Sequence, residues 1–210
     1  PDDGILILLG QHLAYTALSV LVAAVIGIPF GILIGHTGHG RFIGIGLSNA
    51  ARAIPSLGLL VLVVTLLSNG IGPIIGVLAI LALPPILTAT AAGVEGADPE
   101  AVHAARALGM SSGLTMRRIV LPQAMRVIIP PTGNETIAMV KDTSLLMAIP
   151  VGMELFNQAT IVANRTYRIM PAYVAATLWY IIICSVLMVG RNSPRSSRLF
   201  SSRWMRARIL

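Results

Sequence analysis

Polar and charged side chains interrupt an otherwise apolar stretch in the second half of this chain. The stretch is expected to form one helix over residues 121–149. Glu135 lies 13 residues beyond Pro122, about 20 Å along a helix that rises about 1.5 Å per residue. In a bilayer with an apolar core about 30 Å thick, this carboxylate would lie past the midplane. Asn134, Glu135, Lys141 and Asp142 are four of the polar and charged side chains in the stretch.

The spacing of these side chains places them on adjoining faces. Glu135 and Asp142 are two helical turns apart and share one face, and Asn134 and Lys141 share the next. Charged groups at this depth usually face a bundle interior, a water-filled cavity or a partner charge. We therefore predict a polar stripe on a translocation path, which also includes Thr143. The alternative is that Lys141 pairs with an acidic side chain and only holds helices together.

The sequence carries no recognisable catalytic motif. It has no phosphate-binding glycine loop followed by Lys and Ser or Thr, no Gly-x-Ser-x-Gly and no His-Glu-x-x-His. His12, His36 and His39 lack metal-ligand spacing and are interpreted as interfacial residues. An intramembrane enzyme built on the acidic residues above or on His103 is the alternative, but the sequence offers no convergent acid, base and nucleophile. We expect no enzyme activity, no cofactor and no metal.

The polar segment 98–122 predicts two short helices joined by a glycine turn. Asp98 is a favourable helix N-cap, and Pro99 suits the first helical position. The first helix is expected over 101–108. Gly109 should end it in the left-handed conformation that glycine adopts most easily.

The second short helix is expected over 112–119 and leads into Leu121-Pro122, where Pro122 can begin the next long helix. The small side chains of Ala104 and Ala105 allow a close approach to another protein surface. We therefore predict that this segment makes a protein–protein contact.

The composition indicates that the surrounding elements are membrane helices. Of 210 residues, 55% are hydrophobic and 11% are charged, whereas a soluble domain carries about a quarter charged residues. A helix of roughly 20 residues crosses a bilayer. The fold class is therefore all-α, a polytopic membrane protein with about five spans and the short helices between spans three and four. The spans are expected over 12–35, 43–67 with an interruption at Pro55, 72–94 with a kink at Pro84-Pro85, 121–149 and 171–189.

The distribution of arginine predicts the orientation. Cytoplasmic segments of membrane proteins carry an excess of Lys and Arg. With the N-terminus outside, two arginines, Arg165 and Arg168, lie outside. The C-terminus is then cytoplasmic, and ten arginines lie inside: Arg41, Arg106, Arg117, Arg118, Arg191, Arg195, Arg198, Arg203, Arg206 and Arg208.

The domain organisation is a single membrane domain, 1–190, followed by a basic tail, 191–210, that is expected to be disordered. Six of the tail's residues are arginines, and they supply most of the net charge of +7. A basic tail beside a membrane helix is a topology signal rather than a nucleic-acid surface. The single cysteine, Cys184, excludes an internal disulfide.

The short-helix segment resembles the coupling loop of ABC importer permeases. That loop reads Glu-Ala-Ala, three residues, Gly, nine residues, Ile, one residue, Leu-Pro. The resemblance implies that the loop docks onto a separate ATPase subunit, and the one departure from the pattern is His103 in place of Glu. Seven residues match or occupy the motif positions: His103, Ala104, Ala105, Gly109, Ile119, Leu121 and Pro122.

The two halves resemble different branches of these permeases. Residues 27–29, 53–57 and 83–87 are similar to osmoprotectant permeases for glycine betaine and choline. The runs at 119–124, 130–135 and 141–145 are similar to polar amino-acid permeases.

The resemblance implies a small polar or zwitterionic solute and a multi-pass location in the inner membrane. It implies three protein partners: an ATPase, an extracytoplasmic solute-binding protein and a second permease copy or relative. An inactive or regulatory membrane subunit is the alternative, because His103 and the tail depart from the family.

Overall fold

The structure is a computed structural model that describes residues 5–40, 42, 44, 46, 50, 53, 55–67, 70–148 and 155–192. Every element of the described residues is helical, which confirms the all-α class. Four long helices carry the fold: α1 (Ile5–Thr37), α4 (Ile71–Glu95), α7 (Leu121–Asp142) and α9 (Ile169–Asn192).

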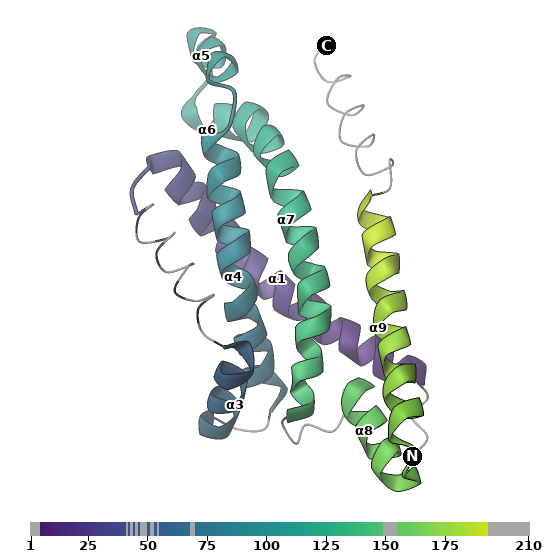
Figure 1. The fold of residues 1–210 in the computed structure, drawn as a ribbon. Helices are drawn as coiled ribbons and strands as arrows, with labels where there is room; N and C mark the ends of the chain where they lie inside the picture. Colours follow the sequence, from purple (N-terminus) through teal and green to yellow (C-terminus); the bar gives the residue numbers. More distant parts are fainter. Residues whose placement is uncertain are drawn as a thin grey trace.

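Short helices lie at the two ends of these long ones (Figure 1). Helix α3 (Ser56–Leu67) and helix α8 (Leu155–Thr166) lie at one end. At the other end, α5 (Pro99–Ala107) and α6 (Ser112–Thr115) connect α4 to α7. The last turn of α9 points toward the same end as α5 and α6.

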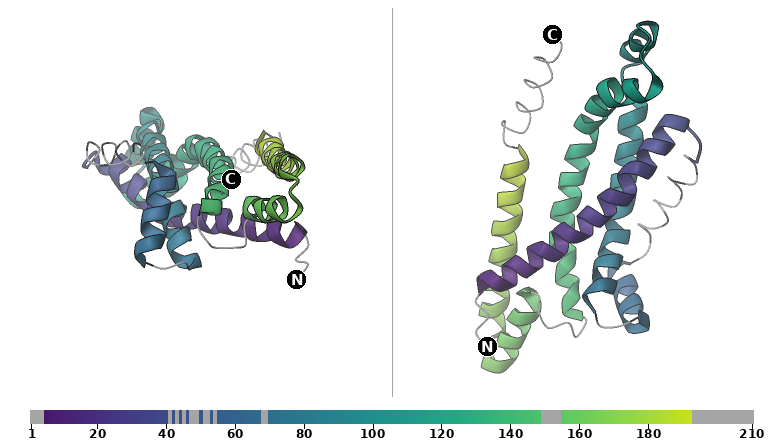
Figure 2. Two further views of the ribbon diagram at one scale, coloured as in Figure 1. Left: turned by 60° about the horizontal axis from the view of Figure 1, so that its bottom comes forward. Right: turned by 180° about the vertical axis from the view of Figure 1, so that it is seen from behind.

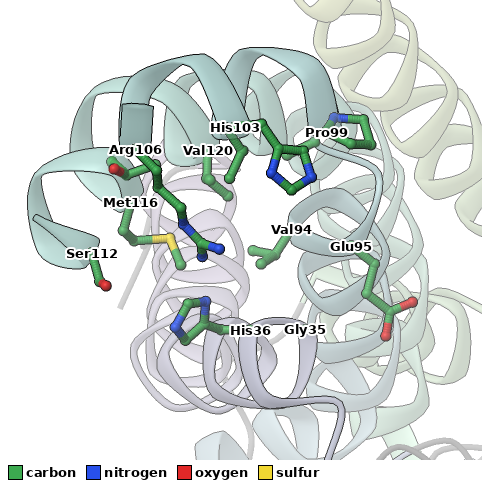
Figure 3. Close-up of a pocket in the computed structure, with 13 residues that line it drawn as sticks. Gly35, His36, Val94, Glu95, Pro99, His103, Arg106, Ser112, Met116 and Val120 are labelled. Atoms are coloured by element: carbon green, nitrogen blue, oxygen red, sulfur yellow. The ribbon is translucent and has the colours of Figure 1, made fainter. Parts of the chain in front are cut away.

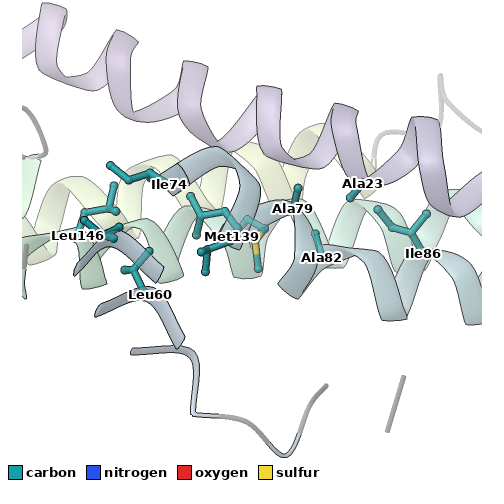
Figure 4. Packing of buried hydrophobic residues seen from close by; sticks show 11 residues of the cluster. Ala23, Leu60, Ile74, Ala79, Ala82, Ile86, Met139 and Leu146 are labelled. Atoms are coloured by element: carbon teal, nitrogen blue, oxygen red, sulfur yellow. The ribbon is translucent and has the colours of Figure 1, made fainter. Parts of the chain in front are cut away.

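The centre of the fold is the pair α4 and α7, which run side by side, with α1 crossing them obliquely (Figure 2). The buried side chains form two apolar clusters. The larger one extends to α3 and to the 3-10 helix Thr143–Ala148 (Figure 4), and the smaller one lies between α4 and α7 near the loop. Small residues such as Ala23 and Ala82 bring the helices close together, and Ile74, Ile86 and Met139 fill the space between them.

Helix α1 packs on α4 through a row of glycines spaced four residues apart. A Cβ added at Gly31 would lie 2.6 Å from Thr90 Cβ, and one at Gly35 would lie 2.7 Å from the Ala91 carbonyl oxygen. Gly27 makes the next contact along the row, at 3.2 Å from Ile86 Cγ2. Small residues at this spacing allow close backbone approach between membrane helices. These glycines are therefore packing residues of the α1–α4 interface.

Among the described residues, three helices are long and apolar enough to cross a membrane, over Leu9–Thr37, Ile71–Glu95 and Ile169–Gly190. They correspond to the first, third and fifth predicted spans. Helix α7 has 22 residues, about 33 Å at 1.5 Å per residue, but it carries the charges noted above. Helix α3 is apolar but has only 12 residues.

The structure describes the second and fourth predicted spans only in part. Helix α3 begins directly after Pro55, and most of the earlier part of the second predicted span, like residues 193–210 of the tail, lies outside the described residues. The fourth predicted span, 121–149, corresponds to α7 and the 3-10 helix that follows it, so only its α-helical part ends at Asp142. Helix α8 was not predicted. It is short and amphipathic, and such a helix gives no apolar run of membrane length.

Candidate functional site

The start of the first short helix forms as predicted. Asp98 caps α5, since its Oδ1 accepts the Glu100 N–H at 3.0 Å. The Asp98 N–H donates to Gln123 Oε1 at 2.9 Å, which ties the start of α5 to the first turn of α7. The loop therefore has a fixed attachment to the helix pair below it.

Gly109 has φ +79°, the left-handed conformation predicted for it. The Gly109 N–H donates to the Arg106 carbonyl at 2.9 Å, and the Met110 N–H donates to the Ala105 carbonyl at 3.1 Å. These two bonds form a Schellman motif, which satisfies carbonyls at the end of α5. A Cβ at Gly109 would meet no atom within 4 Å, so only the backbone conformation demands glycine here.

The second short helix differs from its prediction. Helix α6 has only four residues, and it continues as a π-helix over Met116–Val120 directly into α7. Leu121 and Pro122 begin α7 as predicted, and Ile119 is half-buried in the π turn. A π turn inserts an extra residue into a helix and is frequent at functional sites. No sequence pattern marks this extra residue.

The surface of the loop corrects one expectation. Ala105 is only 4% exposed, because this face of α5 packs against its own chain, so a partner cannot reach its side chain. Ala104 and His103 are exposed, and Leu108 at the tip is 84% exposed. The apolar tip at Leu108 was not anticipated. A leucine next to a turn glycine gives no signal of exposure in the sequence.

The polar residues of α7 lie away from the apolar core. Ile128, Met139 and Val140 are buried on the side of α7 that meets its neighbours. Asn134 and Lys141 are exposed, and Glu135 and Asp142 are half-buried, so the two predicted faces adjoin each other outside the core. Whether they line a path stays a prediction.

His12 is buried, which corrects its interpretation as an interfacial residue. Its ring is 0% exposed, and Nε2 lies 3.0 Å from the Val140 carbonyl and 3.0 Å from Thr143 Oγ1. Tyr180 of α9 packs edge-on against the ring, with centroids 5.3 Å apart. Thr143 also donates to the Val140 carbonyl at 2.8 Å. The ring therefore joins α1 and α9 to the point where α7 becomes a 3-10 helix.

His12 was missed because its partners are distant in sequence. Val140 and Thr143 lie 128 and 131 residues away. The described residues contain no group of three His, Cys, Asp or Glu side chains placed to hold a metal ion. Thr143 was expected on the translocation path, but it is buried and bonded within the chain.

The sequence matches one family over most of the chain. Residues 27–193 match the binding-protein-dependent transport system inner membrane component. The chain belongs to this family. It is therefore an integral membrane component of a transport system, as its apolar helices also indicate.

Relatives of both predicted branches are found. An arginine transport system permease protein of Corynebacterium glutamicum is 46% identical over 99 residues, which are 47% of this chain and 31% of that protein. A glycine betaine/carnitine/choline transport system permease protein of Bacillus subtilis is 25% identical over 189 residues, 86% of this chain and 83% of that protein. The chain spans about a third of the arginine permease and 49% of a probable glutamine permease of Bacillus subtilis.

Solved structures share the fold. A crystal structure of an amino acid ABC transporter with histidines matches with a TM-score of 0.72 and 25% identity, over 93% of this chain and 90% of that one. The methionine ABC transporter MetNI in inward-facing conformations matches with a TM-score of 0.72 and 20% identity, which bears on the fold alone.

Proposed function

We propose that this chain is the permease subunit of an ABC importer for a small polar or zwitterionic solute, either a polar amino acid or a betaine-type osmoprotectant. The family is one of transport components, and the relatives include an arginine and a choline permease. A separate subunit hydrolyses ATP, and this chain has no catalytic activity of its own. The observation that carries the proposal is the loop formed by α5, α6 and the Gly109 turn at one end of the helix pair.

The ATPase subunit docks on the exposed side of this loop. The exposed Leu108 side chain at the tip is an apolar contact point. Ala104, one turn earlier, has a small exposed side chain that allows the ATPase surface to approach closely. Gly109 and the Asp98 cap hold α5 at both ends, so movement of the ATPase would pass to α7 through a rigid element. In this role Ala105 acts by packing α5 on its own chain rather than by touching the partner.

The chain crosses the inner membrane five times, with the loop on the cytoplasmic side. Helices α5 and α6 and the end of α9 lie on the same side (Figure 1), as expected when two spans, the fourth and the fifth, separate the loop from the C-terminus. Arg106, Arg117 and Arg118 lie at this end and are exposed. Thiol labelling of single cysteines in a Cys184→Ala background tests this. A cysteine at position 192 that reacts with a membrane-impermeant reagent from outside would contradict it.

Two permease subunits enclose the path, and α7 lines it. The stripe of Asn134, Glu135, Lys141 and Asp142 faces away from the core of its own chain. Charged side chains in a membrane usually face other protein or water, and a second copy or a related permease would provide both. A solute-binding protein delivers the solute at the opposite end, near α3 and α8.

The alternative is an inactive or regulatory subunit, favoured by His103 in place of the usual acid. The experiment that tests the function begins with co-purification of the chain with a candidate ATPase subunit from the same organism. Leu108→Asp should abolish this association, whereas Leu114→Asp, an exposed leucine in α6 away from the tip, should retain it. Uptake of labelled arginine or choline into vesicles then separates an active permease from a regulatory one. No association for the wild-type chain would refute the proposal.

A further inference from the structure

A cavity of about 270 Å³ lies beneath the loop, where the ends of α1 and α4 meet α5 and the π-helix. Its lining includes His36 of α1, His103 and Arg106 of α5, Thr115 of α6 and Glu95 of α4. The volume is below that of pockets for drug-sized ligands, about 300–1,000 Å³. It suits a small group.

The cation-forming side chains of this cavity converge. In Figure 3 the Arg106 guanidinium and the His36 and His103 rings point toward the same space, whereas the Glu95 carboxylate points away from it. An arginine is always charged, and an imidazole N–H can donate a hydrogen bond. A guanidinium charge together with two hydrogen-bond donors favours an anion in the space between them.

Thr115 gives an independent indication of a ligand. It is 3% exposed and lines the cavity, yet its Oγ1 has no hydrogen-bond partner among the residues that the structure describes. Buried hydroxyls are nearly always bonded, and leaving one unbonded costs about 1–3 kcal/mol. The π-helix begins at the next residue, Met116, which is consistent with a functional distortion here.

His103 distinguishes this cavity from one built on the motif as the family usually has it. The family motif places a glutamate at this position, and a carboxylate would oppose the binding of an anion. Histidine at this position can instead donate a hydrogen bond to the anion. His103, the one departure from the coupling motif, therefore adds a hydrogen-bond donor to the lining of the cavity.

We propose that this cavity binds a phosphate-type anion, held by Arg106 with the two histidines and Thr115 as further donors. Arg106 provides the planar fork that fits two phosphate oxygens. The cavity lies at the ends of membrane helices, so the phosphate can belong to an anionic lipid headgroup or be free in the cytoplasm. The bound anion would join α1 to α5 and so fix the loop against the bundle.

The test uses the full chain in detergent and two probes. Inorganic phosphate is titrated calorimetrically, and binding of phosphatidylglycerol and of phosphatidylcholine is compared by native mass spectrometry. Arg106→Gln should weaken binding about tenfold or more, the usual effect of losing a charge-assisted bond. Thr115→Val removes only the hydroxyl and should weaken it severalfold, and His103→Glu should weaken it as strongly as Arg106→Gln.

Arg118→Gln is the matched control, because it removes the same charge from an exposed residue of the π-helix that does not line the cavity. Binding of phosphate alone with this dependence identifies a free anion as the ligand, and binding of phosphatidylglycerol alone identifies a lipid headgroup. Either result supports the site. Equal losses in Arg106→Gln and Arg118→Gln, or no binding of either probe by the folded wild-type chain, would overturn it.

Discussion

Replacing Gly31 with alanine should loosen the packing of α1 on α4. The added Cβ would lie 2.6 Å from Thr90 Cβ and 2.8 Å from the Leu87 carbonyl oxygen. Thr90 is fully buried, and its Oγ1 donates to the Ile86 carbonyl at 2.7 Å, so its side chain cannot rotate away without losing that bond. The Leu87 oxygen belongs to the backbone of α4. The two helices must therefore move apart.

The magnitude follows from the size of this movement. To bring the 2.6 Å contact to the 3.4 Å at which ordinary van der Waals contact begins, the helices must separate by about 0.8 Å. The same shift loosens the contact of Gly35 with Ala91 one turn further along. Overpacking of this kind costs about 1–3 kcal/mol.

Gly10→Ala is the control for the change in helix propensity. Gly10 lies in the same helix, and a Cβ there would meet no atom within 4 Å. Both variants gain the same propensity, so the difference between them isolates the packing term. Unfolding in sodium dodecyl sulfate, followed by circular dichroism, measures it. Equal free energies of unfolding for Gly31→Ala and Gly10→Ala would refute the close approach of α1 and α4.

Three further outcomes are expected. His12→Phe keeps the ring against Tyr180 but removes its bond to the Val140 carbonyl, so the same titration should show a loss of about 1–3 kcal/mol; an unchanged free energy of unfolding would contradict this role. Glu135→Ala and Asp142→Ala should each lower solute uptake in vesicles while the ATPase still co-purifies. Wild-type uptake by both would remove the α7 stripe from the path.

The long apolar helices and the two ends of α5 could be predicted from local sequence. The apolar runs predicted α1, α4 and α9, since burial in lipid requires long stretches of similar residues. The Asp98 cap and the positive φ of Gly109 were also predictable, because each depends on one residue and its immediate neighbours.

The remainder depends on contacts between segments distant in sequence. The burial of Ala105 and His12 follows from how α5 and α1 pack, and nothing in their local sequence distinguishes them from exposed residues. Gly27, Gly31 and Gly35 are spaced four residues apart, as on a packing face, but only the position of α4 shows that this face of α1 is in contact with another helix. The π-helix after Thr115 also has no counterpart in a local sequence pattern.

Solute-stimulated ATP hydrolysis in vesicles tests the central claim most directly. The chain is reconstituted with a candidate ATPase and solute-binding protein, and Gly109→Val is compared with Gly113→Val. Gly109 has a positive φ and Gly113 does not, and neither added Cβ would meet an atom within 4 Å. A side chain in the left-handed conformation costs about 1 kcal/mol or more. The account predicts stimulation in the wild-type chain, a clear loss in Gly109→Val and a smaller effect in Gly113→Val. Unchanged stimulation in Gly109→Val would contradict the assignment of this loop as the coupling element.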